Sequence, residues 1–247
     1  MDRASIIGIA LGIGAVIGGD MLEGGSVGSI LQPTAAVIVF GGTLGAVLLS
    51  FSLRDVIKAA AALKTVFFES GRRPEEVIDE IVRYASISRK SGFMAIESEL
   101  PRAGDPFLRK ALRLAVDGMS SKVLRETLEQ ELSTFEEEER RAAKVFETAG
   151  GFAPTIGIIG AVFGLIHVME NLSDPAKLGS GIAVAFVATV YGVGSANLLF
   201  LPIAKKIQNR LSQETAAKEM IIEGIWGIQS GVNPYYLGER LKAFVVR

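Results

Sequence analysis

The chain has 247 residues and a formal net charge of −1, and 49% of its residues are hydrophobic while 21% are charged. The mean hydropathy of +0.37 is too high for an average soluble domain, and the near-zero net charge excludes a general attraction to nucleic acid. The chain contains no cysteine, which excludes disulfides and thiolate metal sites. Of the 53 Lys, Arg, Asp and Glu residues, 35 lie between Arg54 and Glu147, so the charged part is separate from the apolar parts.

Four long stretches of the chain contain no Asp, Glu, Lys or Arg. A helix needs about 20 mostly apolar residues to cross a bilayer. Three of the stretches reach that length, and Met21 and Leu22 can extend the first. The sequence therefore predicts an all-α membrane protein with four transmembrane helices in two pairs. The stretches are Ala4–Gly19, Thr34–Leu53, Gly150–Met169 and Gly181–Ile203.

Positive charge is distributed unequally between the two sides of the predicted membrane. The loop 20–33 has no Lys or Arg, and the loop 170–180 has only Lys177. Basic residues follow the second span, precede the third and follow the fourth. Because Lys and Arg concentrate in cytoplasmic loops, we expect both termini and residues 54–148 to be cytoplasmic.

The chain divides by composition into four parts. Residues 1–53 hold spans one and two, 54–148 form a helical cytoplasmic domain, 149–203 hold spans three and four, and 204–247 form a helical tail. We expect the second span to continue as a helix over 54–69 that ends near Gly71. Further helices are predicted over 74–90 and 105–117, with a short element over 93–100. A helix capped by Ser120 or Ser121 is predicted to run into span three, span four is predicted to continue to Gln229, and Asn233-Pro234 to start a terminal helix.

Small residues recur four positions apart in three of the spans. The pairs are Gly8–Gly12, Gly14–Gly18, Gly41–Gly45 and Gly160–Gly164. Glycine is common in membrane helices, but such spacing also lets helix backbones approach closely in lipid. We expect close helix packing, either within the chain or between copies of it.

Two prolines lie in the second pair of spans, Pro154 in the third and Pro202 in the fourth. By the predicted orientation both are near the cytoplasmic edge of the membrane, at matching depth. Each could be an ordinary kink, because proline removes a backbone donor. Together they favour a pair of hinges or a gate.

The polar groups inside the spans are small and neutral. Thr189, predicted to be mid-membrane, either bonds the carbonyl four residues before it or lines a polar path. Neither Thr155 nor Thr189 exchanges protons at neutral pH, so an ion path needs a carboxylate from a partner. His167, the only histidine, is either part of a proton path or a hydrogen-bonded residue at the membrane interface.

Charges of opposite sign lie on the two sides of Gly92 in the predicted cytoplasmic domain: Arg89 and Lys90 before it, Glu97 and Glu99 after it. This segment is either a solvated surface turn or a docking patch, since exposed charges of both signs give specificity and fast association. The chain has no HExxH or P-loop motif, and we expect no enzymatic activity.

The segments Gly151–His167, Ile182–Pro202 and Gly227–Pro234, with the pattern of two plus two spans, resemble the MotA side of the MotA/TolQ/ExbB proton-channel family over essentially the whole chain. The resemblance implies a flagellar stator subunit, five copies of which surround a dimer of a MotB-type partner that supplies a transmembrane Asp. It also implies that Arg89 and Glu97 face the rotor protein FliG, with Lys90 and Glu99 beside them. It links Pro154 and Pro202 to gating, and places Thr189 opposite the partner's carboxylate.

The resemblance also indicates the coupling ion. Sodium-driven relatives carry threonine where this chain has Ala161 and Ala188, and a sodium ion needs several oxygen ligands. We therefore expect coupling to H+ rather than Na+, with no metal or other cofactor. Two alternatives stay open: an ExbB/TolQ-like energiser of an envelope-spanning partner, although those relatives typically have three spans, and a passive membrane scaffold.

Overall fold

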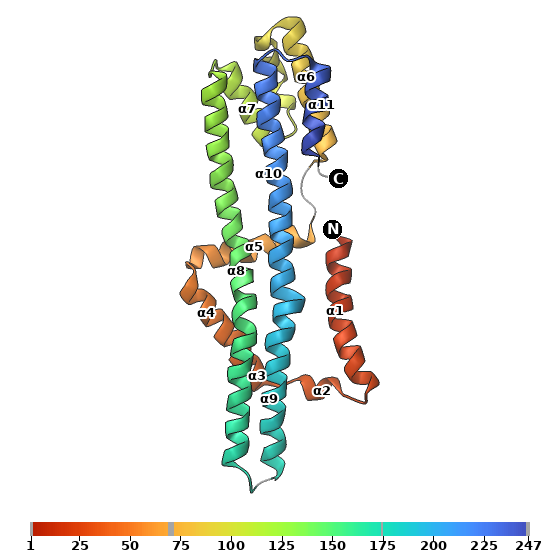
Figure 1. Ribbon diagram of the computed structural model, residues 1–247, viewed down its shortest axis with the longest axis vertical. Helices are drawn as coiled ribbons and strands as arrows, with labels where there is room; N and C mark the ends of the chain where they lie inside the picture. Colours follow the sequence, from red (N-terminus) through yellow and green to blue (C-terminus); the bar gives the residue numbers. More distant parts are fainter. Residues whose placement is uncertain (1, 69–71, 174, 246–247) are drawn as a thin grey trace. The chain divides into compact units, whose positions relative to one another are not determined.

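The computed structural model describes residues 2–68, 72–173 and 175–245, and every regular element within these ranges is a helix (Figure 1). The chain forms two compact units. The first contains Met1–Glu69 and Arg140–Gln208, and the second contains Ser70–Glu139 and Asn209–Arg247. Two long helices, α8 (Ser121–Glu170) and α10 (Leu201–Gln229), contribute residues to both units. The predicted all-α fold is confirmed.

The first unit holds the apolar helices. Besides the second part of α8 and the start of α10, it contains α1 (Arg3–Leu22), α2 (Val27–Ile30), α3 (Pro33–Ala36), the π-helical turn η1 (Val37–Gly41), α4 (Gly42–Ser50), α5 (Leu53–Phe67), α9 (Pro175–Ser195) and the π-helical turn η3 (Ala196–Phe200). Four helical stretches are long and apolar enough to cross a membrane, as the sequence predicts. They lie within Arg3–Leu22, Pro33–Ser50, Ser121–Glu170 and Leu178–Gln229.

The second span does not continue into the next helix, contrary to expectation. Phe51 adopts an extended conformation, which ends α4 at Ser50. Ser52 then caps a new helix, α5, because its hydroxyl accepts the N–H of Asp55 at 3.2 Å. The cap and the extended residue separate α5 from the span. The predicted end of this helix near Gly71 lies outside the described residues.

Two π-helical turns, η1 and η3, interrupt the second and fourth spans. Neither turn was predicted from the sequence. η3 directly precedes α10, whose second residue is Pro202. A proline has no backbone N–H to donate to a carbonyl of the preceding turn. A π-helical turn accommodates the missing hydrogen bond. The fourth span therefore passes into α10 without a break, as expected.

The second unit is a bundle of charged helices around an apolar core. It contains α6 (Pro74–Ser91), the 3-10 helix η2 (Phe93–Arg102), α7 (Pro106–Val116), α11 (Pro234–Leu241), the 3-10 turn η4 (Lys242–Phe244), and parts of α8 and α10. Gly92 ends α6 with a φ of +84°, which glycine adopts readily. The carboxylate of Asp105 caps α7, and the side chain of Asn233 caps α11.

The core of the second unit depends on close contact between α10 and its neighbours. Ile81, Tyr84 and Ile225 are completely buried. A Cβ added to Gly224 would lie 2.8 Å from the side chain of Ile81 on α6, and one added to Gly227 would lie 2.5 Å from Leu237 on α11. Glycine at these two positions therefore sets how closely α10 packs against α6 and α11.

Candidate functional site

Helices α8 and α9 run side by side in the first unit (Figure 1). Glycines of both helices lie at their contact. A Cβ added to Gly157 would lie 2.8 Å from the carbonyl oxygen of Ala188, and one added to Gly164 would lie 2.7 Å from the backbone of Gly181 and Ala185. Neither glycine can carry a side chain without moving α9. The Gly160–Gly164 pair is thus used for helix packing within the chain, which is one of the two uses that the sequence predicted.

The other small-residue pairs are open except at Gly12, where an added Cβ would lie 3.3 Å from the side chain of Leu198. A Cβ at Gly8, Gly14 or Gly18 on α1 would meet no described atom within 4 Å, and the same holds for Gly41 and Gly45. No residue of α1 is buried. These faces are free for lipid or another subunit.

The two prolines lie at different levels of the α8–α9–α10 arrangement. A Cβ at Gly192 would lie 3.2 Å from the Cα of Pro154, so Pro154 is level with Gly192 on α9. Gly150, one turn earlier on α8, lies against Leu201, the neighbour of Pro202. At 1.5 Å per residue, four residues separate the two levels by about 6 Å. Pro154 and Pro202 therefore differ in depth by about one helical turn, whereas the sequence predicted matching depths.

The two alanines that were predicted to bear on ion choice have different surroundings. Ala188 is completely buried, and a Cβ built on Gly160 would lie 2.8 Å from its methyl group. Ala161 is only half-buried. Ala188 therefore belongs to the contact between α8 and α9, whereas Ala161 has room for a larger side chain.

The hydroxyl of Thr189 donates to the carbonyl oxygen of Ala185 at 3.2 Å, and Thr155 donates to Phe152 at 2.8 Å. Thr189 is half-buried and Thr155 is exposed. A hydroxyl has one proton and two lone pairs. With the proton engaged, each oxygen can still accept a hydrogen bond but cannot donate one.

Tyr191 fastens α9 to the segment that precedes the second span. Its hydroxyl donates to the carbonyl of Ile30 at 2.6 Å and accepts the N–H of Gln32 at 3.4 Å. Its ring stacks on Phe40 with centroids 5.7 Å apart. Tyr191 was not predicted to make this contact. The sequence signal for this contact was a tyrosine inside an apolar span, because a buried hydroxyl needs a hydrogen-bond partner.

His167 is exposed near the end of α8, where its carbonyl accepts the side-chain N–H of Asn171 at 2.9 Å. Within the described ranges its imidazole ring has no hydrogen-bond partner. The role of His167, in a proton path or at the membrane interface, therefore stays a prediction.

The second unit carries the charges around Gly92. Arg89, Lys90 and Glu97 are exposed, and none of them forms an ion pair with a described residue. Glu99 is half-buried and pairs with Arg102 at 2.9 Å. Three of the four predicted contact residues are therefore available to another molecule.

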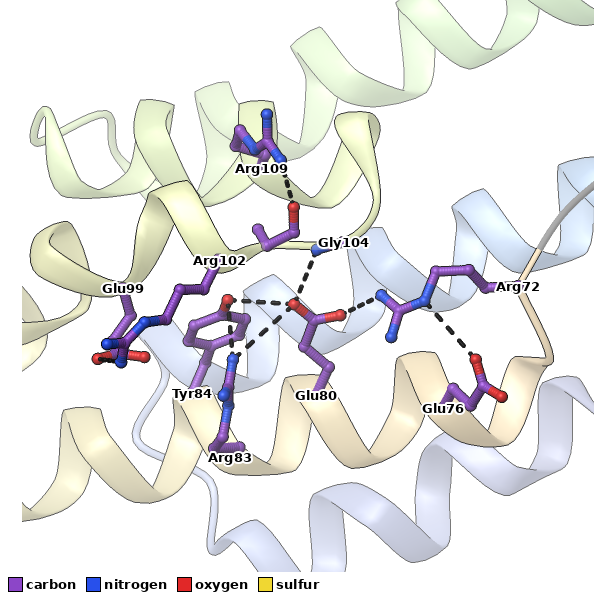
Figure 2. A network of polar contacts seen from close by, with 10 residues as sticks. Arg72, Glu76, Glu80, Arg83, Tyr84, Glu99, Arg102, Gly104 and Arg109 are labelled. Atoms are coloured by element: carbon purple, nitrogen blue, oxygen red, sulfur yellow. Dashed lines mark hydrogen bonds and ion pairs between the residues drawn. The ribbon is translucent and has the colours of Figure 1, made fainter.

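A polar network holds η2 in place beside α6 (Figure 2). The carboxylate of Glu80 on α6 is buried, pairs with Arg72, and accepts the Tyr84 hydroxyl and the Gly104 N–H, both at 3.1 Å. Arg109 on α7 donates to the carbonyl of Ala103. The turn that follows η2 is thus tied to α6 and α7, which fixes the position of Glu97 and Glu99. Glu80 was not predicted to have this role, and its sequence signal was an acid on the apolar face of α6, beside Val77 and Ile81.

The network also perturbs the carboxyl at its centre. Burial raises the pKa of Glu80, but the hydrogen bond from Arg72, the Gly104 N–H and the positive charge of Arg72 outweigh it, so the pKa lies below its ordinary value. The carboxylate therefore stays ionised at neutral pH and acts as a fixed anchor.

A second anchor lies at the start of α1. Asp2 is buried, caps α1 through the N–H of Ala4 at 3.0 Å, and pairs with Lys206 on α10. Its backbone N–H donates to the carbonyl of Phe67 at 2.8 Å. The hydrogen bond from Lys206 holds the pKa of Asp2 well below its usual range. Helix α1 is thus attached at its N-terminus, although none of its own residues is buried.

Comparison with known proteins agrees with this arrangement. A model of the MotA/TolQ/ExbB proton channel family matches residues 100–220, and a model for the Motility protein A N-terminal region matches 6–92. Motility protein A of Bacillus subtilis is 32% identical over 99% of this chain and 91% of that protein. Chemotaxis protein PomA of Vibrio alginolyticus is 34% identical over 99% of this chain and 96% of that protein. A solved structure of C. jejuni MotAB has a TM-score of 0.95 at 33% identity, covering 100% of this chain and 97% of that one.

These observations define a helical membrane protein of the channel type. The chain belongs to the MotA/TolQ/ExbB proton channel family, and within that family it is a subunit of the flagellar stator. The match over residues 6–92 favours the stator over the energiser alternative.

Proposed function

We propose that copies of this chain surround a MotB-type dimer and together form a proton channel that turns the flagellar rotor. The four apolar stretches contain no Asp, Glu, Lys or Arg, so the partner's membrane Asp supplies the ionisable group. The solved relative is a MotAB complex, which supports a partner of this kind. Five copies of this chain around two partners is the stoichiometry we propose.

The hydrogen bond from Thr189 to Ala185 carries this proposal. Because the Thr189 proton is engaged, its oxygen accepts a hydrogen bond from a protonated carboxyl but offers nothing to a carboxylate. Thr189 therefore favours the neutral form of the partner's Asp, and Thr155 repeats the arrangement on α8. The pathway runs past these residues and Ala161 to the region of Pro154 and Pro202.

Electrostatic magnitudes show that one proton can switch such a site. A charge at the bilayer centre costs about 2.5–3.5 kcal/mol on insertion scales. A charge crossing 100 mV releases about 2.3 kcal/mol. Since the two are similar, protonation of one carboxyl decides which arrangement is stable. In our proposal that switch moves residues 54–148, and Arg89, Lys90, Glu97 and Glu99 push on FliG.

The same proposal places the chain in the inner membrane with both termini and residues 54–148 in the cytoplasm, because Lys and Arg concentrate on that side. It couples to H+ rather than Na+ and has no cofactor or enzymatic activity. Swimming that depends on sodium and ignores the proton gradient would contradict the choice of ion.

Replacing the Thr189 hydroxyl with a methyl group tests the proposal. Thr189→Val keeps the shape and removes the acceptor, while Thr189→Ser keeps the hydroxyl. With the MotB-type partner in the same cells, we expect Thr189→Val to lower proton flux and swimming speed at least tenfold at unchanged membrane levels. Thr189→Ser should stay near wild type.

Wild-type proton flux in the Thr189→Val variant would contradict the role of the hydroxyl. Failure of the valine variant to assemble would show that Thr189 is structural. Absence of proton flux through the complex of the wild-type chain with its MotB-type partner would favour a passive scaffold.

A further inference from the structure

A hollow of about 470 Å³ lies beside Arg89 in the second unit. Its wall comes from α6, the start of η2, the turn between α7 and α8, and the end of α10. Arg89 is the one charged residue among its described lining residues, and it makes no ion pair with any described part of the chain. The hollow therefore has a single free positive charge in its wall.

The rest of the wall is uncharged: six of its residues are apolar, two are glycines, and four are polar, namely Ser88, Ser120, Ser121 and Gln229. Two small buried residues, Ala85 and Ala115, leave the space open, and larger side chains surround it: Phe93, Met119, Ile228 and Val232. Burying a leucine-sized side chain strengthens binding roughly ten- to a hundredfold. An exposed ion pair contributes less than about fivefold. The apolar wall can thus supply more affinity than Arg89, while Arg89 selects the sign of the neighbouring charge.

A second hollow of about 370 Å³ lies beside Glu97. It contains Arg109, Arg113 and Asp117 as well as Glu97, so its charges balance and select neither sign. Arg109 is also occupied by the carbonyl of Ala103. The Arg89 hollow is therefore the one whose chemistry specifies an occupant.

We propose that the Arg89 hollow is a socket for a segment of the rotor protein that presents an apolar side chain next to an acidic one. The apolar side chain enters the hollow and the acidic one pairs with Arg89. This inference rests on the proposed function, in which FliG is the partner. It assigns part of the rotor affinity to Met119, Val232 and the other uncharged residues of the wall.

Filling the socket without changing its charge tests the proposal. Ser88 lines the hollow next to Arg89, and Ser120 lines it at the start of α8. Ser88→Trp and Ser120→Trp each place an indole in the space and leave Arg89 intact. Thr127→Trp puts the same side chain on an exposed position of α8 and is the matched control. Full-length chain with its MotB-type partner is reconstituted in nanodiscs, and its affinity for purified FliG is measured together with its thermal stability.

We expect Ser88→Trp and Ser120→Trp to weaken FliG binding at least tenfold with unchanged thermal stability and proton flux. We expect Thr127→Trp to bind like wild type and Arg89→Ala to lose less than about fivefold. Normal binding by both blocking variants would overturn the socket and leave the rotor partnership intact. Absence of FliG binding by the wild-type complex would overturn the partnership and the socket together.

Discussion

Gly192 of α9 lies against the main chain of Ala153 on α8, so closely that a methyl group at Gly192 would lie 2.5 Å from the Ala153 carbonyl oxygen. The next residue of α8 is Pro154. The helix turn that carries this proline is therefore positioned by direct backbone contact with α9, and a bend at Pro154 requires α8 and α9 to move against each other.

Gly192→Ala should force these helices apart. Overpacking of this kind costs about 1–3 kcal/mol, so we expect a lower unfolding temperature of the purified complex and weaker proton flux. Gly194→Ala is the control, because a Cβ there meets no described atom within 4 Å. Equal unfolding temperatures for the two variants would contradict the close contact.

Ala161→Thr and Ala188→Thr should behave differently although both add a hydroxyl. Ala188 is completely buried against α8, so we expect its threonine variant to lose about 1–3 kcal/mol of stability through overpacking. Ala161→Thr should assemble normally and remain proton-driven. Membrane levels and swimming speed at varied sodium concentration check both outcomes, and normal assembly of Ala188→Thr would count against the packing role.

Lys206→Ala should loosen the start of α1. The variant leaves the buried Asp2 carboxylate without its lysine partner, so we expect faster amide hydrogen exchange in the first turn of α1. Lys205→Ala, at the exposed neighbouring position, should leave exchange unchanged. Identical exchange in both variants would show that the capping bonds of Asp2 suffice by themselves.

Acid should weaken the second unit through Glu80. Its pKa is lower in the folded chain than its ordinary value of 4.5, so the unfolded state binds more protons as pH falls. The stabilisation is complete above about pH 4.5 and is lost progressively below it. We expect Glu80→Gln to cost about 2 kcal/mol at pH 7 and to unfold with a weaker acid dependence. Glu75→Gln, exposed on the same helix, is the control, and unfolding temperatures from pH 7 to about pH 2 measure both.

Reversing two exposed charges together, Arg89→Glu with Glu97→Lys, should uncouple the rotor. Both side chains lack a partner among the described residues, so the exchange should leave unfolding unchanged. We expect a severalfold lower swimming torque with proton flux retained. Flux and torque that fall in parallel would place these residues in the channel rather than at the rotor.

Much of the architecture follows from the sequence because its signals are local. Charge-free stretches of about 20 residues predict the spans, and caps such as Asp105 and Asn233 predict where helices begin. The break at Ser52 was missed because the run Thr34–Leu53 is uncharged throughout, and hydropathy alone does not show that Phe51 is extended. The local signal was Ser52 itself, a capping residue three positions before Asp55. The π turns η1 and η3 were missed since they have no comparable local signal.

For the candidate functional residues, too, the sequence identified some features and only the tertiary structure showed others. The sequence identified Thr189, Pro154 and the charges around Gly92 as candidates by type and position. The tertiary structure decided that the Thr189 hydroxyl is engaged as a donor and that Arg89 lies at a hollow. It also decided that Glu80 anchors η2 from 24 residues away, through the Gly104 N–H.

The amino-acid order by itself determined which segments are apolar enough for a membrane, because that property sums over neighbouring residues. It could not determine which of the glycine pairs are in use: Gly160 and Gly164 pack against α9 and Gly12 lies near Leu198, while a Cβ at Gly8, Gly14 or Gly18 would meet no described atom within 4 Å. Identical spacings have different surroundings, since a contact between helices depends on residues distant in the chain that only the folded arrangement brings together.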